Sequence, residues 1–249
     1  GQVRYGHMPS KTIQIARHYS PPLQQLMSAT LKPSDNLYAN SLYLLATNHV
    51  RHAPSTWSDA QVTAPNYLKE LTHIDFDNAV FTDGSGLSHF NKVTPYQTLS
   101  LLTYLYTKFP LAYEYISALP ISGFDGTLVR RLNRPDQKGL VRAKTGTLVG
   151  VYSLSGYVLS KNDHILAFAM YINVRKGTPP HIAGGYRGFI DAATNILIQS
   201  EPSNFHHSLF FAHDNPKGKT NLTAEDMARR KMAFWRNLEY ALKRELNGK

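Results

Sequence analysis

The fold is decided by residues 140–174, which read LVRAKTGTLVGVYSLSGYVLSKNDHILAFAMYINV. Three stretches rich in β-branched and aromatic side chains follow one another here, near residues 140–148, 151–160 and 165–174, and this pattern is typical of strands. The link Lys161-Asn162-Asp163 has the residue types of a hairpin turn, so we expect the last two strands to pair antiparallel. Helical spacing of apolar residues follows and predicts a helix that covers the sheet: Phe189, Ala192, Ala193, Ile196 and Leu197.

Two further helices are expected upstream of the sheet. Residues 37–51 carry an apolar face, and Ser34-Asp35-Asn36 stands just before them with residue types that favour N-caps and turns. Thr94-Pro95-Tyr96-Gln97 combines a Thr cap, a proline at the first helical position and a capping-box Gln, which predicts a helix to about residue 109. Residues 53–67 are polar and predict loop with short helix, and residues 2–5 predict a short strand.

Composition indicates a folded globular chain that can bury its own core. Of 249 residues, 42% are apolar and only 18% are charged, the opposite of a disordered composition. The formal charge of +10 raises nucleic acid as a partner, but the basic residues are scattered among acidic ones, which indicates a solvated basic surface. A nucleic-acid binder, resting on charge alone, would lose duplex binding between low and physiological salt. The chain has no cysteine, which excludes disulfides and thiolate metal sites.

Neither end of the chain has the pattern of the central sheet region. Residues 1–20 are polar and lack the apolar core of a signal peptide, so we expect any export signal to lie upstream. Residues 201–222 are expected to be loop, and Thr223 begins a predicted amphipathic helix that ends near Leu246. Its modest apolar side fits packing on the domain better than peripheral contact with a membrane, and both stay open. No stretch is long and apolar enough for a membrane span.

Several motif-like patterns lack the context that their chemistry needs. Gly218-Lys219-Thr220 resembles the tail of a phosphate loop, but the required earlier glycine is His213. His49 and His52 have helical spacing without a convincing third ligand, so we expect no metal site. The sequence contains no Gly-x-Ser-x-Gly elbow, which argues against an α/β-hydrolase.

The pair of motifs that has the right context is Ser34-Asp35-Asn36 and Lys144-Thr145-Gly146. Either tripeptide alone is too common to decide a function, and Ser160-Lys161-Asn162 repeats the first pattern. However, the first motif precedes a predicted helix and the second lies in a predicted strand followed by a hairpin. Penicillin-recognising enzymes require these two contexts.

The flanking sequence resembles the class C low-molecular-mass penicillin-binding proteins, D-alanyl-D-alanine carboxypeptidases and endopeptidases of the S13 type. The resemblance covers about residues 15–197 and rests on these stretches, in this order: Ser20-Pro21-Pro22-Leu23, Ser34-Asp35-Asn36-Leu37-Tyr38-Ala39, Asp83-Gly84-Ser85-Gly86-Leu87-Ser88, Leu119-Pro120 with Gly123, Asp125-Gly126-Thr127-Leu128, Val141 to Leu148, and Ser153 to Val158. It implies the α/β fold of the β-lactamase and DD-peptidase superfamily, an antiparallel sheet with helices on both faces. It also implies three regions: residues 1–20 as the end of an inserted region, 21–200 as the C-terminal part of the peptidase domain, and 201–249 as an extension.

The resemblance implies a role for each motif residue. Such enzymes cleave peptidoglycan stem peptides ending in D-Ala-D-Ala through an acyl-serine, need no cofactor, and are acylated by β-lactams. Ser34 would relay a proton to the leaving amine, Asn36 would position the acyl side, and Lys144 would supply positive charge. Thr145 and Thr147 would bind the substrate carboxylate, the N–H of Thr147 would form half of the oxyanion hole, and Gly146 would let substrate lie along the strand.

The sequence departs from the family at the nucleophile. The family motif is Ser-x-x-Lys, and no serine here has a lysine three residues later; Lys32 and Lys92 follow Ser28 and Ser88 by four. We therefore expect the chain to be the C-terminal portion of such an enzyme, with an incomplete fold and no turnover of substrate alone. The alternative is a catalytically inactive homologue that binds peptidoglycan. Because the substrate lies outside the cytoplasmic membrane, either protein would be periplasmic or otherwise extracytoplasmic.

Overall fold

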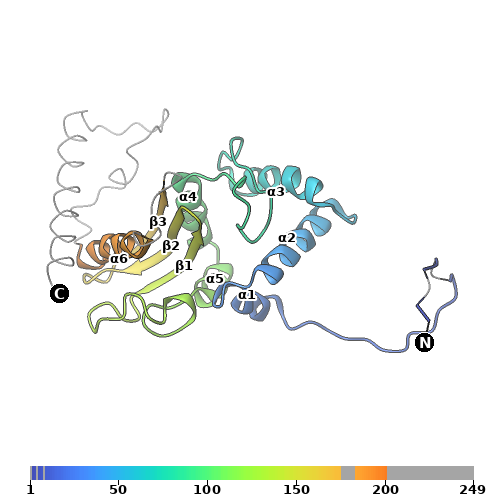
Figure 1. Ribbon diagram of the computed structural model, residues 1–249, viewed down its shortest axis with the longest axis horizontal. Helices are drawn as coiled ribbons and strands as arrows, with labels where there is room; N and C mark the ends of the chain where they lie inside the picture. The colour runs from blue at the N-terminus through green and yellow to red at the C-terminus, as the bar shows by residue number, and fades with distance from the viewer. Residues whose placement is uncertain (1, 4, 8, 175–182, 201–249) are drawn as a thin grey trace.

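The computed structural model describes residues 2, 3, 5–7, 9–174 and 183–200. It has a mixed α/β architecture (Figure 1), and its elements in chain order are α1 (Leu23–Leu31), α2 (Asn36–Arg51), α3 (Trp57–Thr72), α4 (Pro95–Tyr106), α5 (Leu111–Ala118), the 3₁₀ turn η1 (Gly126–Leu128), β1 (Val141–Leu148), β2 (Val151–Leu159), β3 (Ile165–Asn173) and α6 (Ala183–Gln199). The predicted extension at residues 201–249, with its amphipathic helix, lies outside the described residues.

The sheet has three antiparallel strands in the order β1-β2-β3, which confirms the predicted strands and hairpin. Lys144 of β1 pairs with Ser155 of β2, which pairs in turn with Ala169 of β3. Successive residues of a strand point to opposite sides, so every second side chain of each strand lies on the same face of the sheet. β2, in the centre, therefore has two buried faces.

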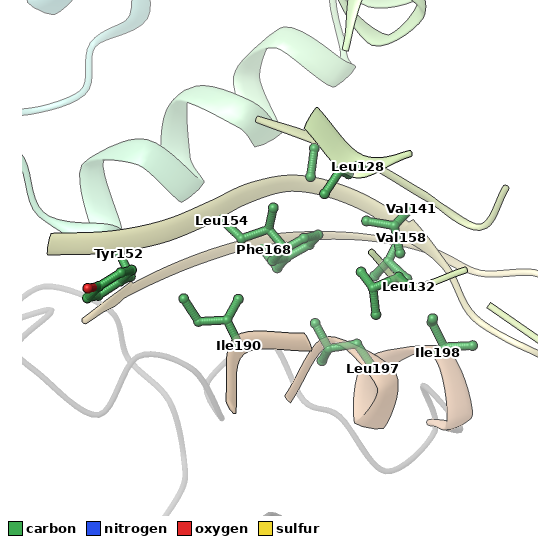
Figure 2. Packing of buried hydrophobic residues seen from close by; sticks show 11 residues of the cluster. Leu128, Leu132, Val141, Tyr152, Leu154, Val158, Phe168, Ile190, Leu197 and Ile198 are labelled. Carbon is green, nitrogen blue, oxygen red and sulfur yellow. The ribbon is translucent and has the colours of Figure 1, made fainter. Parts of the chain in front are cut away.

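The two faces of the sheet are covered by different helices. Tyr152, Leu154 and Val158 of β2 point toward α6, and Figure 2 shows them facing Ile190, Leu197 and Ile198 of that helix. Tyr157 of β2 points to the other face, where it packs with Leu102 of α4 and with Leu119. The core on the α6 face consists of Leu128, Leu132, Val141, Ala143, Tyr152, Leu154, Val158, Phe168, Ile190, Leu197 and Ile198.

The helices differ from expectation in one large respect. The polar stretch 53–67 was predicted to be loop with short helix, but residues 57–67 belong to the sixteen-residue helix α3. Thr56 and Asp59 form a capping box that starts this helix, and Pro65 lies inside it. The capping box supplies the start signal that apolar periodicity did not, so the prediction of loop with only a short helix was wrong. Smaller differences are that α4 ends at Tyr106, not near residue 109, and that Gln2, Val3 and Tyr5 form no strand.

The segment between α5 and β1 lies along the outer side of β1. Ser122 N–H donates to Val141 O at 2.9 Å, and Ala143 N–H donates to Pro120 O at 3.0 Å. These bonds hold the segment against only the first half of β1. From Lys144 onward, no described strand pairs with β1 on this side, so the half that carries Lys144-Thr145-Gly146 is an open sheet edge.

Candidate active site

Ser34 lies in the sharp joint between α1 and α2. Asp35 is the N-cap of α2, and its side chain accepts from Tyr38 N–H at 2.9 Å, while its own N–H donates to Thr30 O at 2.9 Å. Ser34 has a positive φ of 64°, a conformation that L-residues rarely adopt. Because Asp35 performs the capping, the hydroxyl of Ser34 is left free for another partner.

That partner is Lys144 on β1. Its Nζ donates to Ser34 Oγ at 2.7 Å across 110 positions of sequence, and to Thr145 O at 2.7 Å. The structure thus brings the two predicted motifs together at one point. Burial lowers the pKa of Lys144 from 10.5 to about 8, because desolvation disfavours the charged ammonium. Near pH 8, a lysine of this kind can hold a serine hydroxyl by a charge-assisted bond and exchange a proton with it.

The backbone of β1 presents donors and acceptors at the open edge. Ala143 N–H points outward, to Pro120 O, and backbone groups alternate along a strand. The N–H groups of Thr145 and Thr147 therefore also point away from β2. Thr147 is exposed, whereas Thr145 is partly buried and its hydroxyl donates to Thr127 Oγ1 at 2.9 Å. An extended peptide can hydrogen-bond to such an edge.

Gly146 lies on the same face of the sheet as Lys144, opposite Ser153 of β2. A Cβ at position 146 would collide with the hydroxyl of Ser153. The missing side chain therefore has a role inside the sheet, which the sequence did not indicate. Its predicted role toward substrate stays a prediction.

Asn36 is the first residue of α2, and its side chain is exposed. One and two turns further along α2, Asn40 and Tyr43 hold the loop that contains Asp83-Gly84-Ser85-Gly86. Asn40 Oδ1 accepts from the N–H groups of Gly84 and Ser85 at 3.1 and 2.9 Å, and Tyr43 Oη donates to Phe81 O at 2.6 Å. Positions 36, 40 and 43 recur at helical spacing, a signal from which Asn40 and Tyr43 could have been found.

Sequence reasoning also missed the roles of Thr127, which contacts Thr145, and of Lys32, which contacts Thr127 and lies two residues before Ser34. Lys32 forms an ion pair with Asp125 at 2.6 Å, and its carbonyl accepts from Thr127 N–H at 3.1 Å. Among the described residues, no group of three His, Cys, Asp or Glu side chains could hold a metal ion, and no helix is long and apolar enough to cross a membrane.

Known proteins resemble this chain over most of its described length. It is 33% identical over 176 residues to the D-alanyl-D-alanine carboxypeptidase DacB of Haemophilus influenzae, covering 70% of this chain and 36% of that protein. It is 33% identical over 188 residues to the D-alanyl-D-alanine carboxypeptidase of Actinomadura sp., covering 72% of this chain and 34% of the relative. The chain therefore spans about a third of the length of these relatives.

The fold agrees with a solved structure of the same kind of protein. Penicillin binding protein 4 (DacB) of Haemophilus influenzae, crystallised with a β-lactam, superposes with a TM-score of 0.68 at 31% identity, covering 78% of this chain and 46% of that one. The model of the D-Ala-D-Ala carboxypeptidase 3 (S13) family matches residues 1–191, which include both motifs of the candidate site. The chain belongs to the S13 family of D-Ala-D-Ala carboxypeptidases.

Proposed function

We propose that this protein serves as a serine-type D-alanyl-D-alanine carboxypeptidase or endopeptidase that acts on peptidoglycan stem peptides through an acyl-serine intermediate. The observation that carries the proposal is the contact between Ser34 Oγ and Lys144 Nζ at 2.7 Å beside an open strand edge. Membership of the S13 family supports the reaction class, because its description names the D-Ala-D-Ala carboxypeptidases.

Each group has a task that its geometry suits. Ser34, bonded to a lysine whose pKa is about 8, relays a proton toward the leaving amine of D-alanine. The charge of Lys144 attracts the terminal carboxylate of the substrate. Thr147 donates its hydroxyl to that carboxylate, and Thr145 does so on giving up its bond to Thr127 Oγ1. The outward N–H of Thr147 forms one half of the oxyanion hole. Asn36, exposed at the start of α2, donates its amide to the acyl side of the substrate.

The acyl-serine step needs a nucleophile, which the family carries in a Ser-x-x-Lys motif that residues 1–249 do not contain. The proposed substrate places the protein outside the cytoplasmic membrane, in a periplasm or a comparable space. β-Lactams are proposed as covalent inhibitors, since a related protein has been crystallised with one. The chemistry assigned to these residues requires no cofactor.

A fluorescent penicillin tests the proposal on the protein expressed from its complete reading frame. We expect a covalent label, and we expect Lys144→Ala to slow labelling at least about 100-fold, the scale of a lost charge-stabilising group. Lys69→Ala is the matched control. Lys69 lies in α3, forms an exposed ion pair with Asp77 and touches neither motif. Absence of label, or equal labelling of the Lys144→Ala protein, would overturn the proposal.

A second candidate is a peptidoglycan-binding homologue without catalysis, and the absent Ser-x-x-Lys spacing favours it. It predicts that a D-Ala-D-Ala peptide shifts the NMR resonances of Thr145 and Thr147 in the 249-residue protein. It also predicts that the protein from the complete reading frame binds the peptide but releases no D-alanine. Release of D-alanine by that protein would exclude this candidate.

A further inference from the structure

The turn Asp125-Gly126-Thr127, just ahead of and within η1, contacts both halves of the candidate site. On one side, Asp125 Oδ2 accepts from Lys32 Nζ at 2.6 Å, and Thr127 N–H donates to Lys32 O at 3.1 Å. On the other side, Thr127 Oγ1 accepts from the hydroxyl of Thr145 at 2.9 Å. One short turn is thus bonded to the residue two positions before Ser34 and to the residue next to Lys144.

Further contacts fix this turn in place. Asp125 Oδ1 accepts from Ile121 N–H at 2.8 Å, and Ile121 itself bridges to Arg142 of β1. Lys32 Nζ also donates to Leu119 O at 3.0 Å, so the ammonium is bonded to both ends of the segment 119–125. The segment is hydrogen-bonded to β1, and Lys32 is bonded to the segment.

The surroundings of Gly126 show how closely the turn approaches the backbone of Lys32. Its φ is +55°, and a Cβ there would lie 2.6 Å from Lys32 O and 3.1 Å from Pro120 Cβ. A left-handed glycine is needed both for the turn and for this contact. The backbone of Lys32 therefore lies directly against the turn, which leaves the joint at Ser34 little freedom on this side.

We infer that Lys32, through its ion pair with Asp125 and its contacts with the turn Asp125-Gly126-Thr127, is a positioning residue that holds Ser34 within hydrogen-bonding distance of Lys144, and that Thr127 fixes the hydroxyl of Thr145. The joint at Ser34 connects helices α1 and α2, and Ser34 itself has a rarely adopted φ of 64°. A backbone in that region persists only when its surroundings hold it. Lys32, two residues earlier, supplies the tertiary anchor. The geometric part of the inference stands alone, and only its catalytic consequence rests on the proposed function.

The ε-carbon NMR resonance of Lys144 in the 249-residue protein tests the geometric part. It is assigned by its loss in Lys144→Arg. We expect Lys32→Met to loosen Ser34, to admit water to Lys144 and to raise the pKa of Lys144 from about 8 toward 10.5. Lys69→Met is the control, because it removes another Lys–Asp ion pair with the same 2.6 Å separation, between Lys69 and Asp77, outside the site.

Two further variants keep the test decisive if Lys32→Met fails to fold. Asp125→Asn keeps an acceptor for Ile121 N–H but removes the charge, and we expect it to raise the pKa of Lys144 in the same direction. Lys32→Arg retains a cation and should restore the wild-type value. An unchanged Lys144 resonance and pKa in a folded Lys32→Met or Asp125→Asn protein would overturn the inference.

Penicillin labelling then separates the inference from the proposed function. We expect Asp125→Asn to slow labelling about tenfold in the protein from the complete reading frame, with Lys69→Met unchanged. A protein that takes no label refutes the proposed function but leaves the NMR result standing. If the Asp125→Asn protein labels normally although the pKa of its Lys144 has shifted, only the catalytic consequence of positioning is refuted.

Discussion

Gly146 of β1 lies opposite Ser153 of β2, and the hydroxyl of Ser153 occupies the space that a side chain at position 146 would need. We predict that Gly146→Ala lowers the free energy of unfolding by about 1–2 kcal/mol, because the added methyl overpacks the interior of the sheet. Chemical denaturation measures the change. Adding Ser153→Ala should restore most of the loss, since the two sites share one space. A double variant no more stable than Gly146→Ala would contradict this account.

The depressed pKa of Lys144 makes a prediction for stability against pH. Below about pH 8 this lysine is charged in both folded and unfolded states; between pH 8 and 10.5 the unfolded chain binds more protons. The free energy of unfolding contributed by Lys144 therefore rises with pH through this window. We expect the difference in Tm between the wild type and Lys144→Met to change in favour of the wild type from pH 7 to pH 10. Each kcal/mol of unfolding free energy should change Tm by about 2–4 °C.

Buried tyrosines do not confuse this comparison. Burial raises the pKa of Tyr115 to about 12, so its contribution is lost only as the pH rises above 10, and it is present in both proteins. Only the difference between the two Tm curves reports Lys144. Parallel curves from pH 7 to pH 10 would show that Lys144 has an ordinary pKa.

The contact between α2 and the loop at residues 83–88 makes a third prediction. A Cβ at Gly84 would collide with Tyr43 Cβ and lie 2.6 Å from Ala39 O, and neither α2 atom can move without moving the helix. Gly84→Ala should lower the free energy of unfolding by about 1–3 kcal/mol. Gly188→Ala is the control: Gly188 lies in α6 with nothing within 4 Å, so this variant should gain about 1 kcal/mol from helix propensity.

Comparison of the two variants by thermal denaturation decides whether steric contact is the cause. If both alanines stabilise, the loop is not packed against α2 as described. If Tyr43→Phe lowers the stability of the wild type but lowers that of the Gly84→Ala protein no further, loss of the bond from Tyr43 to Phe81 O would be the cause instead.

The sheet and the Ser34–Lys144 contact could be predicted from sequence for different reasons. The strands follow from local residue types and hairpin chemistry, both of which are visible within 35 residues of chain. The contact across 110 positions has no local signal and was expected only from the family resemblance. The ion pair of Lys32 with Asp125 spans 93 positions and lies outside the motif tripeptides, so neither route indicated it. Lysine and aspartate are also common as solvated surface residues, so their identity in the sequence did not indicate this role.

Helix α3 was missed although its start signal is local. Apolar periodicity is weak there, and Pro65 within the helix argues against one in a pattern search. The capping box supplies what periodicity lacks: Thr56 Oγ1 accepts from Asp59 N–H at 3.2 Å, and Asp59 Oδ2 accepts from Thr56 N–H at 2.8 Å. The hydrogen bond from Thr56 N–H is the largest of the causes that hold the pKa of Asp59 below its usual value.

The capping box of α3 therefore makes the last prediction. Thr56→Ala removes the acceptor for Asp59 N–H, and we expect it to lower the free energy of unfolding by about 1 kcal/mol. For a chain of this size the Tm should fall by about 2–4 °C. Thr56→Ser keeps the hydroxyl and removes only a methyl group, so its Tm should match the wild type. If Thr56→Ser and Thr56→Ala lower the Tm equally, packing of the methyl group and not the cap would start the helix. Because the box contacts neither Ser34 nor Lys144, neither variant should alter the pKa of Lys144, which the same NMR measurement can verify.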